Sequence, residues 1–127
     1  MTEHPNAAMY RRLIAAMTDE DMDAIGEMVS DDIVYHTIGS TEPLRGREAV
    51  LASFSGLDDA GFEFEIELHD VVANDDHTIA LVTARVAKGD DRIEYRTAEI
   101  LHAENGKFTE RWAFSDDTER ITRFFGS

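Results

Sequence analysis

Residues 31–50 read DDIVYHTIGSTEPLRGREAV, and this stretch decides the fold. The β-branched run at 33–37 predicts a short strand, the glycine, serine and proline of 38–45 predict a loop, and the apolar spacing of 47–54 predicts a helix. The strand ends on three polar side chains, Tyr35, His36 and Thr37. In such an arrangement the strand end would lie at the mouth of a pocket, so these side chains are the first candidates for chemistry.

Two helices are expected on the N-terminal side of this stretch. Apolar residues recur at helical spacing over residues 6–18, which predicts an amphipathic helix. Asp19 or Asp21 can cap a second, short helix, whose apolar residues continue to Val29.

The second half of the chain changes to the period of two that is typical of half-buried strands. Apolar and acidic residues alternate from Phe62 onward, and further strands are predicted over residues 78–87, 93–103 and 108–114. The last of these hairpins contains Asn105-Gly106, a strong turn signal, and Asp116 or Asp117 can cap a final helical turn. The order predicts an α+β fold, with a strongly curved antiparallel sheet around the N-terminal helices and a conical pocket between them.

Length and composition set the class of protein. A chain of 127 residues predicts one domain, over residues 1–127, and a hydrophobic fraction of 43% is typical of a globular protein. The net charge of −15 repels phosphate groups, so neither nucleic acid nor an anionic membrane is expected as a partner. The absence of cysteine excludes disulfides and thiolate chemistry. Without a long apolar run or an apolar leader segment, a cytoplasmic location is expected.

Several short motifs, taken in order, resemble the nuclear transport factor 2-like superfamily, and within it the SnoaL-like and ketosteroid isomerase-like proteins. The motifs are Ala16-Met17 with Asp21-Met22-Asp23-Ala24-Ile25, Asp31-Asp32-Ile33-Val34, Gly39 with Pro43-Leu44-Arg45-Gly46 and Glu48-Ala49-Val50, and Asn105-Gly106-Lys107-Phe108 with Glu110 and Trp112. The resemblance implies a cone-shaped fold, a small apolar molecule as ligand, and a homodimer formed through the convex face of the sheet. It covers isomerases, cyclases, hydrolases and binding modules alike.

Steroid isomerases of this kind use a carboxylate base, a tyrosine and a protonated carboxylic acid. In this chain the position of the base falls on Thr37, beside His36, and the position of the tyrosine falls on Leu13, with Tyr10 one turn away. The position of the neutral acid falls near Glu99. Two of the three groups are missing or displaced, which argues against steroid-type isomerisation.

The polar residues themselves suggest acid–base chemistry. His36 is a candidate general base, and because Tyr35 alternates with it, only one of the two can face the pocket. Glu99 and His102 are predicted on opposite faces of one strand, and Glu99 can serve as a pocket acid or form a salt bridge with Arg96 or Arg111. Glu110 is predicted to share a face with three aromatic residues, Phe108, Trp112 and Phe114, with Trp112 either in the core or on the pocket wall.

The leading hypothesis is therefore a small enzyme that needs no cofactor and no metal. His36 and a carboxylate, Glu99 or Glu110, would be the catalytic residues, and the substrate would be contacted by Tyr10, Tyr35, Thr37, His102 and Trp112. No histidine pair has the spacing of a metal site. The alternative is a non-catalytic ligand-binding or dimerisation module of the same fold.

Overall fold

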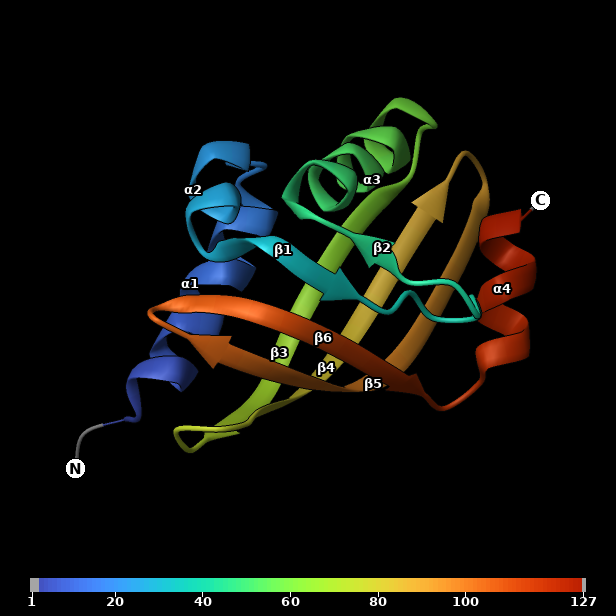
Figure 1. Cartoon of the computed structure of the whole chain (residues 1–127). Coiled ribbons are helices and arrows are strands. Elements are labelled where there is room, and N and C mark those ends of the chain that lie inside the picture. The colour runs from blue at the N-terminus through green and yellow to red at the C-terminus, as the bar shows by residue number, and fades with distance from the viewer. Residues whose placement is uncertain (1–2, 127) are drawn as a thin grey trace.

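A computed structural model describes residues 3–126 of the chain. Four helices and six strands follow one another in a mixed α+β order (Figure 1). The helices are α1 (Pro5–Thr18), α2 (Met22–Glu27), α3 (Arg47–Asp59) and α4 (Thr118–Gly126). The strands are β1 (Val29–Tyr35), β2 (Leu44–Arg45), β3 (Glu63–Ala73), β4 (Thr78–Lys88), β5 (Asp91–Glu104) and β6 (Lys107–Ser115).

The strands form one curved sheet in the order β2-β1-β6-β5-β4-β3. The predicted antiparallel meander is confirmed from β3 to β6, and β1 joins its end by pairing parallel to β6. Figure 1 shows α1 and α2 at one end of the sheet and α4 at the other, with α3 lying above the long strands. The cone-shaped α+β architecture expected from the sequence is thus present.

Three boundaries differ from the sequence prediction. The sequence predicts Val29 in the second helix, but α2, which Asp21 caps at its start, ends at Glu27, and strand β1 begins at Val29. The Val29 carbonyl then accepts a hydrogen bond from Arg47 Nε at 3.1 Å. The predicted loop contains the two-residue strand β2, which pairs with the end of β1, and α3 continues to Asp59.

The hairpin between β5 and β6 follows the sequence signal closely. Asn105 and Gly106 have φ angles of 53° and 77°, the pair of positive values that a tight type I′ turn requires. This turn matches the twist of the two strands, and it sets the register in which the pocket residues of β5 and β6 face each other.

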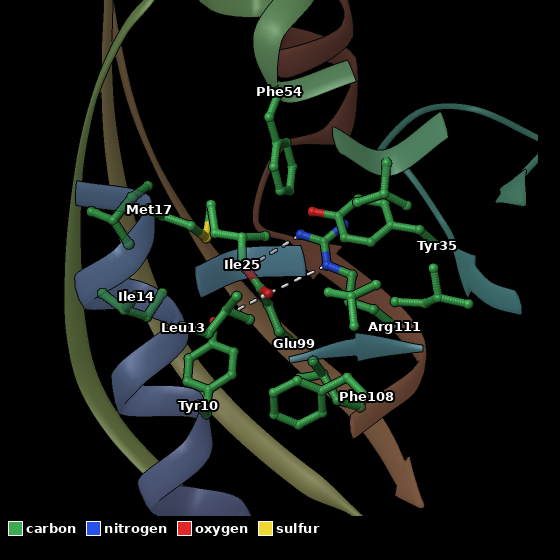
Figure 2. A pocket seen from close by; sticks show the side chains of 15 residues that line it. Tyr10, Leu13, Ile14, Met17, Ile25, Tyr35, Phe54, Glu99, Phe108 and Arg111 are labelled. Atoms are coloured by element: carbon green, nitrogen blue, oxygen red, sulfur yellow. Dashed lines mark hydrogen bonds and ion pairs between the residues drawn. The ribbon is translucent and has the colours of Figure 1, made fainter. Parts of the chain in front are cut away.

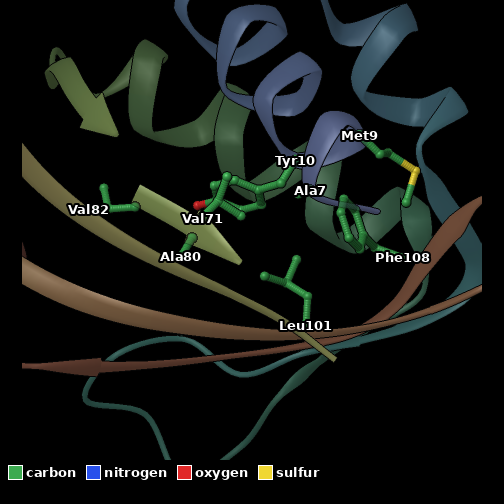
Figure 3. Close-up of a cluster of buried hydrophobic side chains, with 8 residues drawn as sticks. All are labelled: Ala7, Met9, Tyr10, Val71, Ala80, Val82, Leu101 and Phe108. Atoms are coloured by element: carbon green, nitrogen blue, oxygen red, sulfur yellow. The ribbon is translucent and has the colours of Figure 1, made fainter. Parts of the chain in front are cut away.

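The concave face of the sheet packs against α1. Figure 3 shows eight buried side chains at this contact: Ala7, Met9 and Tyr10 from α1, and Val71, Ala80, Val82, Leu101 and Phe108 from the strands. The Tyr10 and Phe108 rings meet edge-on with centroids 6.3 Å apart. Burial of each large side chain of this kind stabilises the fold by roughly 1.5–3 kcal/mol, so the contact anchors α1 above the sheet.

A β-bulge changes the faces of β6. Glu110 pairs with His102 and Phe108 with Ala103, which leaves Thr109 as an extra residue between them. Phe108 therefore lies in the core while Glu110 lies on the outer, convex face of the sheet. The prediction that these two residues share a face is wrong, because one inserted residue reverses the alternation.

None of the helices formed by residues 3–126 is long and apolar enough to cross a membrane.

Candidate functional site

A small cavity lies between the concave face of the sheet and the helices α1, α2 and α3 (Figure 2). Its free volume is about 50 Å³. The wall is mainly apolar, and the lining side chains are Tyr10, Leu13, Ile14, Met17, Ile25, Val29, Ile33, Tyr35, Val50, Phe54, Ile66, Glu99, Leu101, Phe108 and Arg111. A few polar groups converge within this apolar wall, which is the usual composition of a small-molecule site.

A carboxylate on β5 holds these polar groups together. Glu99 Oε1 accepts hydrogen bonds from the Tyr10 hydroxyl at 3.1 Å and from Arg111 Nε at 3.3 Å. Its second oxygen, Oε2, lies 3.3 Å from Arg111 Nη2. The two charged side chains are 15% and 10% exposed, so they form a buried ion pair. Tyr10, Glu99 and Arg111 come from α1, β5 and β6, and the pair therefore ties three elements together.

Arg111 is fixed by further contacts on its other side. Its Nη1 donates a hydrogen bond to the backbone carbonyl of His36 at 2.9 Å, just beyond the end of β1. Its guanidinium carbon lies 4.4 Å from the centre of the Tyr35 ring, a cation–π contact. The Tyr35 ring in turn meets Phe54 of α3 edge-on, with centroids 5.9 Å apart. A continuous chain of contacts therefore crosses the pocket from α1 to α3.

Burial sets the protonation states of these groups. Burial raises the pKa of Tyr10 well above its usual value, and the neighbouring Glu99 charge adds to this effect. Burial likewise raises the pKa of Tyr35. For Arg111, burial alone would lower the pKa, but the nearby Glu99 carboxylate, with smaller contributions from Tyr35 and Tyr10, more than offsets this and the net pKa is raised. At neutral pH the two phenols are therefore neutral and the Arg111 guanidinium is charged.

Three residues predicted from the sequence line this pocket: Tyr10, Tyr35 and Glu99. Of the two alternating residues at the end of β1, Tyr35 faces the cavity and the His36 ring faces the opposite side of the sheet. Of the two roles considered for Glu99, the salt bridge is formed, and its partner is Arg111 rather than Arg96.

The other predicted residues gather on the outer face of the sheet. The His36 ring stacks on Trp112 at 5.2 Å between centroids, and His102 meets the same indole edge-on at 5.0 Å. Glu110 lies between the histidines, with Oε2 3.3 Å from His36 Nε2 and Oε1 3.6 Å from His102 Nδ1. Thr37 is exposed in the loop that follows β1. Of the two carboxylates considered as partners for His36, Glu110 is the one it contacts, and Glu99 is not, because strand alternation sends His36 and Glu99 to opposite faces.

On the outer face, the His36 and His102 rings approach different oxygens of the Glu110 carboxylate, so the three side chains do not converge on a common point. Within residues 3–126, no group of three or more His, Asp or Glu side chains is arranged to hold a metal ion.

Arg111 is the pocket residue that sequence reasoning missed as a functional group, since it was considered only as a partner for Glu99. Such deep burial is unusual for an arginine, and nothing in its flanking residues indicates it. The signal lay in the pairing of strands: once Trp112 is placed on the outer face, its neighbour Arg111 must point into the cone.

The comparisons with known proteins agree with this architecture. The family model described as SnoaL-like domain matches residues 10–111. No curated protein sequence matches the chain. A solved structure from a soil-derived mobile gene cassette is 25% identical, covers 94% of this chain and 95% of its own, and superposes with a TM-score of 0.87.

Two more distant structures share the fold. An LEH-like epoxide hydrolase from M. tuberculosis is 17% identical, with 97% of each chain covered and a TM-score of 0.80. An NTF2-like protein of unknown function from Burkholderia pseudomallei is 16% identical, with 98% of this chain and 99% of that chain covered and a TM-score of 0.83. The family match covers most of the chain and the fold agrees along its length, so the chain belongs to the SnoaL-like family.

Proposed function

We propose that the cavity beneath α1 and α3 binds a small apolar molecule, and that Glu99 performs acid–base chemistry on it without a cofactor. The observation that supports this most directly is one buried carboxylate in an otherwise apolar pocket, hydrogen-bonded to a neutral phenol and paired with a guanidinium. Enzymes of this type move a proton with a positioned carboxylate and keep water away from the reacting atoms.

Glu99 would act as the proton acceptor in this scheme. Its carboxylate already accepts a hydrogen bond from Tyr10, so a proton gained by Glu99 can be shared with the phenol oxygen. Tyr10 would act as a positioning residue, because burial keeps it neutral and packing against Phe108 fixes its ring. Isomerisation, cyclisation or hydrolysis of a small molecule would each use a proton transfer of this kind.

A second candidate is binding without turnover, and the size of the cavity favours it. Pockets for drug-sized ligands enclose about 300–1,000 Å³, whereas this cavity has about 50 Å³, enough for a few water molecules. A ring-sized ligand therefore requires Phe54 or Met17 to move away from the centre of the pocket. The Glu99 carboxylate is also fully engaged with protein groups, as a structural ion pair would be.

A matched pair of variants separates the two candidates. Glu99→Gln removes the pocket carboxylate, and Glu110→Gln makes the same change on the outer face of the neighbouring strand. Cyclohexene oxide and 3-cyclohexen-1-one serve as probes, with binding followed by ligand-observed NMR and products by gas chromatography.

Turnover that is lost in Glu99→Gln and retained in Glu110→Gln supports the enzyme. Binding in both variants with no product from the wild-type protein supports the binding module. If neither probe binds the wild-type protein, and a wider set of neutral ring compounds also fails, the proposed ligand site is wrong.

We also propose that two copies of the chain associate through the outer face of the sheet. Four apolar side chains there are well exposed and form the outer apolar patch, namely Val72 at 57%, Ile79 at 39%, Leu81 at 44% and Phe114 at 60%. Val72 pairs with Ile79 across two strands, and Leu81 and Phe114 flank Ala98 in the next row. A contiguous apolar surface of this kind is typical of an interaction site, and a two-fold axis would cover both copies at once.

Sedimentation velocity at micromolar concentration tests this association. The wild-type protein is expected to sediment as a dimer, and Leu81→Arg as a monomer. Ala52→Arg places the same charge on the exposed surface of α3 and should leave the dimer intact. A wild-type monomer across the whole concentration range would refute the proposal.

A further inference from the structure

Three imidazoles and one carboxylate lie together on the outer face of the sheet, beside the outer apolar patch. These side chains, His36, His77, His102 and Glu110, form the histidine cluster. We propose that the cluster takes up a proton when two copies of the chain associate, so that the dimer becomes tighter as the pH falls from 8 to 6. This inference rests on the proposed dimer, because it names a condition that regulates that contact.

The register of the strands places the cluster directly beside the patch. Ile79 pairs with Ile100, and Ile100 pairs with Trp112, so the three form one row across the outer face. The paired residues His102 and Glu110 form the next row on the same face of β5 and β6. Neighbouring rows on one face of a sheet are roughly 7 Å apart. The cluster therefore begins where the patch ends, and no other row separates them.

A second copy seated on the patch also covers part of the cluster. A stable interface covers about 800 Å² on each partner, which is more than four partly exposed side chains can offer. The interface must therefore extend beyond the patch, onto the row of Thr83 and Arg96 on one side and onto the cluster on the other. The contact then removes water from the carboxylate of Glu110.

Loss of water at Glu110 favours a proton on a neighbouring ring. Glu110 Oε2 lies 3.3 Å from His36 Nε2, and Oε1 lies 3.6 Å from His102 Nδ1. A carboxylate is costly to cover without a counter-charge and less costly to cover as part of an ion pair. Imidazole is the side chain that gains a proton between pH 8 and pH 5. One proton from the solvent, on either ring, turns this contact into an ion pair with no net charge.

Other charged or titratable groups surround the cluster on the same strands and in the adjoining turn. They are His77, Arg45, Glu104, Lys107, Asp75 and Asp76. The His77 ring lies edge-on to His102, with centroids 4.8 Å apart. Arg45 is separated from Glu110 by Val34. Lys107 Nζ donates to the Glu27 carbonyl, and Asp75 pairs with His4. Among residues 3–126, the groups that pair with Glu110 are thus the imidazoles of His36 and His102.

The charge of the whole chain changes association in the same direction. Each copy carries a net charge of −15, so two copies repel each other, and protons on any histidine reduce this repulsion. Salt separates the two effects, because the screening length is about 3 Å at 1 M ionic strength and covered pairs are screened much less. A pH dependence that persists in 1 M sodium chloride therefore comes from the cluster.

Sedimentation velocity on dilution series of the full chain, at pH 8 and pH 6 in 1 M sodium chloride, tests the proposal. The wild-type dimer should bind about tenfold more tightly at pH 6, because a threefold preference for the proton in each copy multiplies over two copies. Glu110→Gln removes the charge that needs the proton. Its dimer should be equally tight at both pH values, and tighter at pH 8 than the wild-type dimer. Glu48→Gln removes an exposed carboxylate from α3, and it should keep the wild-type pH dependence.

The fluorescence of Trp112 provides a second measurement that leaves Glu110 unchanged. Trp112 is the only tryptophan of the chain, and its ring contacts those of His36 and His102. A protonated imidazole quenches the fluorescence of an adjacent indole. Because linked equilibria are reciprocal, the pH of half-quenching should be about half a unit higher in the wild-type dimer than in monomeric Leu81→Arg.

Equal dimer affinity of the wild-type protein at pH 8 and pH 6, or weaker affinity at pH 6, would overturn the proton linkage. So would the same half-quenching pH in the dimer and in the monomer. Glu110→Gln that is folded by circular dichroism and keeps the wild-type pH dependence would also overturn it; if this variant fails to fold, the fluorescence comparison decides. A wild-type protein that is monomeric at both pH values would refute the proposed association itself, and the linkage with it.

Discussion

Replacement of Arg111 by methionine tests whether the ion pair in the pocket behaves as a buried one. The substitution removes the guanidinium but keeps a long apolar side chain, so it leaves the Glu99 carboxylate, which is 15% exposed, with a single hydrogen bond from Tyr10. Breaking a buried pair by removing one partner costs about 3–5 kcal/mol of unfolding free energy. Domains of this size have a total stability of about 5–15 kcal/mol, so Arg111→Met should remove a substantial part of it.

The double variant Glu99→Met/Arg111→Met separates the charge effect from simple loss of contacts. It removes both charges, so no uncompensated carboxylate remains in the pocket. The Tyr10 hydroxyl and the His36 carbonyl lose their partners, which costs about 1–3 kcal/mol each where the group remains without water. The double variant should nevertheless recover about 2 kcal/mol relative to Arg111→Met, because an orphaned ion costs more than these neutral groups.

Urea denaturation monitored by far-ultraviolet circular dichroism measures these differences. Arg85→Met is the matched control, because Arg85 is 40% exposed and pairs with Glu67 at 3.1 Å on the outer surface. A surface pair of this kind contributes little to stability, because solvent screens it. The reasoning fails if Arg111→Met loses no more stability than Arg85→Met, or if the double variant is as unstable as the single one.

Three further predictions follow from buried phenols, backbone geometry and pocket size. Burial raises the pKa of Tyr95 from 10.0 to about 12. Because the phenol ionises at lower pH in the unfolded chain, the free energy of unfolding should keep its full value below pH 10 and fall by roughly 3 kcal/mol as the pH rises through 12. Ionisation of Tyr95 near pH 10 in the folded protein, followed by absorbance at 295 nm, would contradict this. Gly39→Ala should destabilise the protein by about 1–3 kcal/mol more than Gly106→Ala in thermal unfolding. Both glycines have positive φ, but only at Gly39 would a new Cβ clash with the Thr122 side chain; equal losses would refute the clash. Phe54→Ala should lower stability by about 3–5 kcal/mol at most and tighten the binding of ring-sized neutral ligands, measured by ligand-observed NMR; unchanged affinity would show that Phe54 does not limit the pocket.

The sequence was most informative where local periodicity determines the outcome. Alternation along residues 93–103 placed Glu99 and His102 on opposite faces, and the structure has Glu99 in the cavity and His102 beside Trp112. The same rule limited Tyr35 and His36 to opposite faces, although it could not say which one faced inward. That choice depends on how β1 pairs with β6, a contact between segments more than seventy residues apart.

Two features had no local signal. The bulge at Thr109 depends on how β6 adapts to the end of β5, and without it Phe108 and Glu110 would share a face. The burial of Arg111 depends on three partners from distant segments, namely Glu99, the His36 carbonyl and the Tyr35 ring. Local hydrophobicity predicts an exposed arginine, and only the assembled sheet shows that the Glu99 carboxylate lies beside Arg111 in the interior.

The predicted residues separate into a pocket group and an outer-face group because successive side chains of a strand point to opposite faces of the single sheet. Neighbouring residues of β1 and β6 alternate between the pocket and the outer face, so Tyr35 stacks on Arg111 inside while His36 stacks on Trp112 outside. His36 takes part in both groups, because its ring pairs with Glu110 and its backbone carbonyl accepts a hydrogen bond from Arg111. The polar residues at the end of β1 thus lie beside the cavity, but of these only Tyr35 lines it, together with the ion pair of Glu99 and Arg111. A histidine at such a strand end indicates that its backbone lies near the pocket. Whether its ring points into the pocket can be decided only once the pairing of its strand is known.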